Sequence, residues 1–145
     1  MALLFADPVA PISTAPPAPV PGPVYEPGVC NIGPAEIARR RRGAWAATIV
    51  TLVLAIAVFA LGWPPPARVV IALPAAAAIV SWLQVVLHFC VGFARLGVFN
   101  FGAVGPMERV VDPAARRADQ RRAASMIVVA LVGGLAIGLT AALLP

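Results

Sequence analysis

The sequence contains no lysine and one histidine, and only 12% of its residues are charged. Without lysine there is no phosphate-binding loop of the GxxxxGKS/T type, and the HExxH and GxSxG patterns and paired carboxylates of hydrolases are also missing. The two cysteines, Cys30 and Cys90, are too few for a disulfide framework. These absences leave no recognisable enzyme active site, and we expect the protein not to be an enzyme.

What the chain has in excess is apolar residues, at 61% with a mean hydropathy of +0.91. A soluble domain is about half apolar and about one quarter charged, so lipid is the expected solvent here. Three apolar runs are long enough to cross about 30 Å of hydrocarbon. We therefore predict an all-α polytopic membrane protein with three transmembrane helices, at about residues 44–62, 69–93 and 124–144.

The arginines predict how these spans are oriented. Ten arginines lie before the first span or in the loop 94–123, whereas one, Arg68, lies in the turn 63–68. Arginine accumulates on the cytoplasmic side of membrane proteins. We expect the N-terminus and the loop 94–123 in the cytoplasm and the C-terminus outside, in the inner membrane of a bacterium.

Residues 1–33 form a proline-rich cytoplasmic arm ahead of this membrane domain, which covers residues 34–145. Eight prolines fall within residues 1–29, and proline excludes both a helix interior and a central strand. An extended polyproline conformation is expected. The arm is either a disordered tail or a segment that lies along a partner protein.

Two spans carry small residues at four-residue spacing, which lets helices in lipid approach closely. The two stripes are Ala130, Gly134, Gly138 and Ala142 in the third span, and Gly43, Ala47, Thr51 and Ala55 in the first. Either the stripes pack this chain's own helices together, or one of them docks on another subunit.

The second span carries the polar residues. In a continuous helix Ser81, Gln84, His88 and Arg95 would share one face, and polar groups inside a membrane should face protein. His88 is the strongest cofactor candidate, as a ligand of haem or another metal or as a proton relay. The simpler alternative is a hydrogen bond between helices, with Gln84, Thr48 or Thr51 as its partner.

Cys30 and Cys90 are both expected at the cytoplasmic boundary, where they could meet. A soft-metal site or a redox pair is one hypothesis, and two inert buried thiols is the other. No cofactor is the leading expectation. The first basic cluster is expected at the lipid headgroups, and the second is most simply a solvated face, with headgroup binding as its alternative. These clusters are Arg39, Arg40, Arg41 and Arg42, and Arg116, Arg117, Arg121 and Arg122.

Three segments carry a resemblance: CNIGPAEIARRRR from Cys30, FC at Phe89 and Cys90, and GVFNFG from Gly97. This combination resembles a group of small uncharacterised bacterial three-span membrane proteins. The resemblance covers about residues 30–144. It implies a bacterial three-span membrane protein and brings no activity with it.

Three functions remain as hypotheses. The first is a non-catalytic accessory or assembly subunit of a larger membrane complex, such as an electron-transfer complex, with lipids and other membrane subunits as partners. The second is a cofactor or metal protein that uses His88, or Cys30 with Cys90. The third is a small homo-oligomeric transporter or channel. Nucleic acid is not an expected partner, because the arginines lie beside apolar spans.

Overall fold

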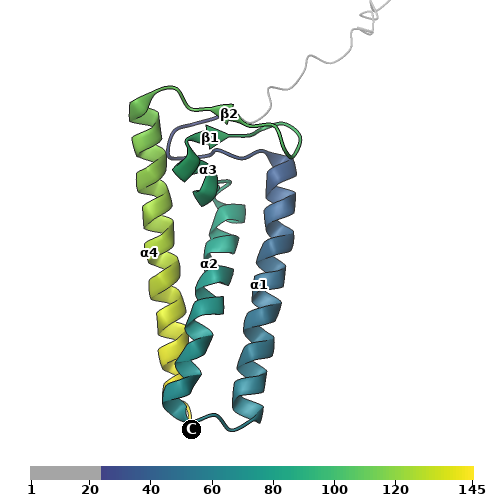
Figure 1. Ribbon diagram of the computed structural model, residues 1–145, viewed down its shortest axis with the longest axis vertical. Coiled ribbons are helices and arrows are strands. Elements are labelled where there is room, and N and C mark those ends of the chain that lie inside the picture. The colour runs from purple at the N-terminus through teal and green to yellow at the C-terminus, as the bar shows by residue number, and fades with distance from the viewer. Residues whose placement is uncertain (1–23) are drawn as a thin grey trace, which may run out of the picture.

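The computed structural model describes residues 24–145, and helix dominates this part of the chain (Figure 1). Three long helices run side by side, α1 (Pro34–Ala60), α2 (Ala72–Val86) and α4 (Pro113–Leu143). A 3₁₀ helix, Pro65–Ile71, leads directly into α2. Within the described residues, three helical segments are therefore long and apolar enough to cross a membrane. Most of the predicted proline-rich arm, residues 1–23, lies outside the described residues.

The short elements gather at one end of the molecule, which we call the cap and define as residues 24–33 and 87–112. It contains helix α3 (Val91–Leu96) and the two-stranded antiparallel sheet of β1 (Val98–Phe99) and β2 (Glu108–Arg109). Figure 1 shows residues 24–33 crossing this end, with the C-terminus at the opposite end. The cap thus covers the same end of all three long helices.

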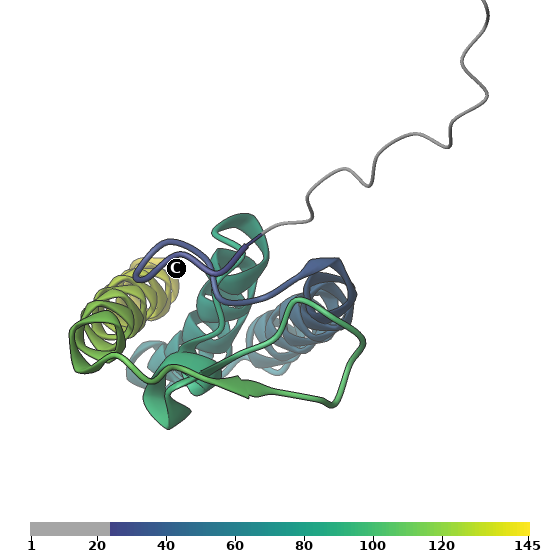
Figure 2. The same ribbon diagram turned by 90° about the horizontal axis from the view of Figure 1, so that it is seen from above.

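Helix α2 lies between α1 and α4 (Figure 2). It packs against both, whereas α1 and α4 approach each other near the end away from the cap. There Val58, Ile71 and Ala141 form a buried apolar cluster. The central position of α2 means that its two faces supply most of the contacts between the long helices.

The contact between α2 and α4 is close because glycine lies at its centre. A Cβ atom on Gly134 would lie 2.5 Å from the Ala72 carbonyl oxygen, and one on Gly138 would lie 2.7 Å from the Ala72 Cβ. Ala130 and Ala141 extend this buried face. The structure thus places most of the α4 stripe against this chain's own α2, with Ala141, rather than the predicted Ala142, buried at its end.

The stripe on α1 is used differently. Ala47 and Thr51 are half-buried, and Thr51 lines a groove between α1 and α2. Gly43 is exposed, and a Cβ atom added there would meet nothing within 4 Å. The α1 stripe is therefore only partly covered by the rest of the described chain.

The helix starts follow local sequence signals. Gly33 is the N-cap of α1 with Pro34 in its first turn. Asp112 is the N-cap of α4, and its carboxylate accepts hydrogen bonds from the backbone N–H groups of Ala114 and Ala115, at 2.9 and 3.2 Å. Both helices begin about three turns before the apolar span that each contains.

The prediction of one continuous second helix over residues 69–93 is wrong at both ends. Its start is a 3₁₀ helix, and Pro74 lies in the first turn of α2, where its missing N–H is not needed, so it does not break the helix interior. Its end comes at Val86, seven residues early. His88 then adopts a left-handed conformation with φ of 51°, and α3 begins at Val91.

Candidate functional site

The cap is held together by the side chain of Asn31, which is fully buried. Its Oδ1 accepts a hydrogen bond from the Cys90 backbone N–H at 2.6 Å, and its Nδ2 donates to the Cys90 carbonyl at 3.1 Å. The backbone N–H groups of Asn31 and Ile32 donate to the His88 carbonyl, at 3.2 and 3.4 Å. Asn31, which precedes α1, thus binds the backbone that connects α2 to α3, at Cys90, 59 positions later in the chain.

A third segment joins the same cluster. The Gly33 N–H donates to the Asn100 carbonyl at 2.7 Å, and the Asn100 N–H donates to the Asn31 carbonyl at 3.1 Å. The buried Asn100 side chain also donates to the Ala103 carbonyl at 2.8 Å. A Cβ atom on Gly33 would lie 2.7 Å from the Phe101 Cα, so the close approach requires glycine. The CNIG, FC and GVFNFG segments therefore meet in space.

This cluster explains why α2 stops early. The backbone groups of His88 and Cys90 are hydrogen-bonded to Asn31 and Ile32. These groups therefore have partners without a further turn of helix. Cys90 then serves as the N-cap of α3, and its Sγ accepts from the Phe93 N–H at 3.4 Å. Long-range hydrogen bonds thus replace the helix that local hydropathy predicted.

The predicted polar stripe along the second span does not form. His88 lies in the left-handed turn with an exposed side chain, and Arg95 lies on α3. The Ser81 hydroxyl donates to the Ala77 carbonyl at 2.7 Å, within α2. Gln84 accepts from Arg40 of α1 at 3.5 Å. The prediction failed because it assumed one helical register through residue 95, whereas α2 ends at Val86.

The threonines proposed as partners for His88 are bonded elsewhere. The Thr48 hydroxyl donates to the Ala44 carbonyl at 2.9 Å and accepts from the Trp82 indole N–H at 3.0 Å. The Thr51 hydroxyl donates to the Ala47 carbonyl at 2.8 Å. Thr48 thus links α1 to α2, and neither hydroxyl is paired with the histidine.

The two thiols have separate partners. Cys30 Sγ donates to the Val24 carbonyl at 3.3 Å, whereas Cys90 is fully buried beside Ile32 and Phe93. Over residues 24–145 there is no group of three or more histidine, cysteine, aspartate or glutamate side chains that could hold a metal ion. The cysteine-metal hypothesis therefore gains no further ligand from this part of the chain.

Sequence reasoning missed Asp119 as a site residue. Its fully buried carboxylate accepts from the Tyr25 hydroxyl at 2.9 Å and from the Gly28 N–H at 2.7 Å. The Tyr25 ring also stacks on Phe99, with ring centroids 4.6 Å apart. A sequence signal exists, because Asp119 lies four residues after Ala115 and four before Ala123, on the apolar face of α4. An acid at such a position indicates a buried partner.

This environment changes the acidity of Tyr25. Burial raises the pKa of the Tyr25 hydroxyl above its usual value, and the hydrogen bond to Asp119 and the negative charge of that carboxylate raise it further. The phenol therefore stays protonated and donates to Asp119 at neutral pH. The bond latches residues 25–28 onto α4.

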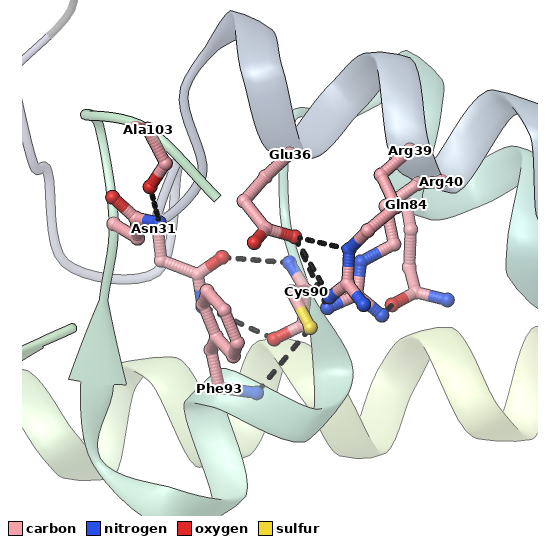
Figure 3. A network of polar contacts seen from close by, with 9 residues as sticks. Asn31, Glu36, Arg39, Arg40, Gln84, Cys90, Phe93 and Ala103 are labelled. Carbon is pink, nitrogen blue, oxygen red and sulfur yellow. Dashed lines mark hydrogen bonds and ion pairs between the residues drawn. The ribbon is translucent and has the colours of Figure 1, made fainter. Parts of the chain in front are cut away.

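The first arginine cluster divides into two pairs. Arg39 forms an ion pair with the buried Glu36 at 2.9 Å, and Arg40 lies 3.7 Å from the same carboxylate oxygen (Figure 3). The Arg40 guanidinium also lies 5.4 Å from the centroid of the Phe93 ring. Arg39 and Arg40 thus form ion pairs with their own chain, whereas Arg41 and Arg42 are exposed and form none among the described residues.

The second cluster is divided in a similar way. Arg116 lies over the left-handed Gly97, where an added Cβ atom would come 2.6 Å from its Nε. Arg116, Arg117 and Arg121 are exposed, and Arg122 is half-buried. The exposed arginines are the ones whose charge is most accessible to a partner or to lipid.

Arg68 ties the other end of the molecule together. Its Nε donates to the Trp63 carbonyl at 3.0 Å, and its Nη1 donates to the Leu144 carbonyl at 2.7 Å. The guanidinium also lies 4.6 Å from the centroid of the Phe59 ring. A cation at the C-terminal end of α4 is favourable for the carbonyls left free there.

No model of a known protein family, no curated protein and no solved structure matches this chain. What the cap can do follows from its own contacts. The side chains of Asn31 and Asn100 in the cap, and of Asp119 on α4 where it bonds the cap, are buried and hydrogen-bonded. Such groups fix the backbone in one arrangement. The cap therefore has the character of a rigid support more than of a reactive centre.

Proposed function

We propose that the protein is a non-catalytic accessory or assembly subunit of a larger complex in the bacterial inner membrane, such as an electron-transfer, respiratory or photosynthetic complex. In this proposal the three long helices cross the bilayer. The cap and the N-terminus lie in the cytoplasm, and the C-terminus lies outside. This orientation is supported by the arginines, because ten of the eleven precede the first span or lie in the loop before the third.

The observation that carries the proposal is the outward face of α1. Along this helix only Glu36, Ala44 and Val58 are buried. Ile49, Val53 and Ile56 are 56%, 60% and 69% exposed, respectively. Helix α4 buries eight residues by comparison. Helix α1 therefore offers an apolar surface, together with the open Gly43, on which a helix of another subunit can pack.

The cap supports the same proposal. Tyr25 and Gly28 are bonded to Asp119, so the proline-rich residues 1–23 are joined to a fixed point on the cap. A proline-rich segment loses little conformational entropy when it binds in an extended form. We propose that it lies along the partner that packs against α1.

The contacts of the other candidates favour a subunit over the two alternatives. His88 lies in a turn outside α2, which removes it from a channel lined by that helix. Ser81 and Gln84 are hydrogen-bonded to Ala77 and Arg40. Cys30 and Cys90 have separate partners.

The test is photo-crosslinking in the membrane followed by isolation in mild detergent. A photoreactive residue replaces Val53 on the outward face of α1, and a matched control replaces Val132 on α4, which is 63% exposed. We expect position 53 to crosslink to another polypeptide at a fixed stoichiometry and position 132 to crosslink to lipid. Lipid adducts alone at position 53, with a purified particle of one chain, would refute the proposal.

A further inference from the structure

Two apolar grooves lie on opposite faces of α2. One, of 350 Å³, lies between α1 and α2 and is apolar along its length. The other, of 370 Å³, lies between α2 and α4, and we call it the α2–α4 groove. Its walls include Ala77 and Val80 of α2 and Ile127 and Leu131 of α4. The two grooves differ in what lies at their ends.

The α2–α4 groove adjoins a polar hollow at the arginine-rich end. This hollow, of 310 Å³, is lined by Arg95 of α3 and by Gln120, Ala124 and Ile127 of α4, among others. Ile127 lines both the hollow and the groove, so the two lie next to each other along α4. The combined surface has a polar head and an apolar tail, as an amphiphile does.

The length of this surface matches one leaflet of a bilayer. Leu131 follows Gln120 by eleven residues on α4, which corresponds to about 16 Å at a rise of about 1.5 Å per residue. Half of a hydrocarbon core of about 30 Å is about 15 Å. An acyl chain that starts at Gln120 would therefore end near Leu131.

The positive charge of Arg95 in the hollow favours an anionic headgroup. Arg95 is exposed and forms no ion pair among the described residues, and no acidic side chain lines the hollow. Arginine binds phosphate oxygens well, and the amide of Gln120 can donate a further hydrogen bond.

We propose that this surface binds one anionic phospholipid of the leaflet on the cap side. The headgroup phosphate lies against Arg95 and Gln120, and one acyl chain fills the α2–α4 groove. The lipid would bridge α3 and α4 at the point where α2 ends. The proposal rests on insertion of the three helices in a membrane and is independent of any partner subunit.

The test is lipid binding by the full-length chain in detergent, measured by native mass spectrometry. The probes are phosphatidylglycerol and phosphatidylcholine with the same acyl chains. We expect one tightly held phosphatidylglycerol and no retained phosphatidylcholine. Arg95→Gln should weaken binding about five- to tenfold, because one favourable charge contact with the headgroup is lost.

Two matched pairs of variants decide the outcome. In the first pair, Arg117→Gln is the control for Arg95→Gln, because it removes an exposed charge of α4 that does not line the hollow. In the second pair, Ala124→Phe fills the hollow, and its control Ala46→Phe alters an exposed position of α1. Arg95→Gln and Ala124→Phe should reduce binding, and the two controls should not. An equal loss of phosphatidylglycerol binding in Arg95→Gln and Arg117→Gln would overturn the proposal, since binding would then depend on the overall positive charge and not on the hollow. Normal binding by Ala124→Phe would also overturn it.

Discussion

Asn31 matters at the scale of single residues because an amide side chain is both a donor and an acceptor. It satisfies the N–H and the C=O of Cys90 at once, as the edge of a β-strand would. Neither aspartate nor leucine, although similar in size, can do both. The end of α2 therefore depends on the chemistry of one amide.

The first prediction concerns this amide. Asn31→Ala leaves the buried Cys90 N–H without a partner, while the Cys90 carbonyl still accepts from the Ala94 N–H at 3.0 Å. The free energy of unfolding should therefore fall by about 1–3 kcal/mol, the cost of one unsatisfied buried group. His88→Ala is the matched control at the same turn, and its exposed side chain should contribute little. Denaturation of the purified chain in mixed detergent, followed by circular dichroism, measures both. Equal stability of the two variants would contradict the role of Asn31.

The second prediction concerns Tyr25, which is the only tyrosine in a chain without lysine. Because the folded pKa is raised, the neutral phenol stabilises the fold, and that contribution is complete below about pH 10 and lost as the pH rises above it. Absorbance of tyrosinate should show a midpoint above 10 in the folded chain and near 10 after unfolding. Asp119→Asn should lower the folded midpoint.

The pH dependence of stability supplies the control for this experiment. Tyr25→Phe removes the titrating group, so it should remove the part of the stability loss above about pH 10 that arises from Tyr25. The free thiols Cys30 and Cys90 are present in both proteins and cancel in the comparison. A folded midpoint at the usual value of tyrosine would show that the latch to Asp119 does not hold in solution.

At the scale of elements, the seam between α2 and α4 depends on backbone approach. Gly134 lies against the carbonyl oxygen and helix backbone of Ala72 and Ala76, where a side chain has no room. In lipid the hydrophobic effect does not drive helices together, so close packing has to supply the attraction. The glycines of α4 therefore set the distance between these helices.

The third prediction compares the same substitution at two glycines. Gly134→Ala forces the helices apart and should reduce the free energy of unfolding by about 1–3 kcal/mol. Gly43→Ala, where the added Cβ meets nothing within 4 Å, should leave stability unchanged or raise it by up to about 1 kcal/mol. Unfolding in mixed detergent checks both. Destabilisation by Gly43→Ala equal to that by Gly134→Ala would argue against a special seam at α4.

At the scale of the whole molecule, the three long helices differ in how much they are buried by their own chain. α2 is covered on two sides, α4 is held through its glycine stripe, and α1 exposes most of its apolar surface. Buried polar contacts tie both ends, through Asn31 of the cap and Asp119 of α4 at one end and through Arg68 at the opposite end. The exposed face of α1 thus belongs to a bundle whose helices are held together by buried polar contacts at both ends.

The fourth prediction tests the orientation of that unit in the membrane. Single cysteines replace Val111 in the cap, 88% exposed, and Leu61 in the turn after α1, 73% exposed. A membrane-impermeant thiol reagent added to intact spheroplasts should label position 61 and not position 111. The parent chain gives the background from Cys30 and Cys90. Labelling of position 111 in intact spheroplasts would reverse the proposed orientation.

Length, hydropathy and capping signals are local properties, and they determined the three long apolar helices and the starts of α1 and α4. Proline after Gly33 and after Asp112 marks a helix start regardless of what packs against it. The proline-rich composition of the arm is equally local, although residues 1–23 lie outside the described structure. These parts of the fold could be read without coordinates.

The break at His88 and the latch at Asp119 could not be read in this way. Local hydropathy continues smoothly through residues 87–93, and what ends α2 is an amide 59 positions away in the chain. The sequence by itself determined which segments are helical and apolar, because those depend on neighbouring residues. Only the tertiary structure decided where α2 stops, which stripe packs inside and which polar groups are buried, because each depends on partners brought together by folding.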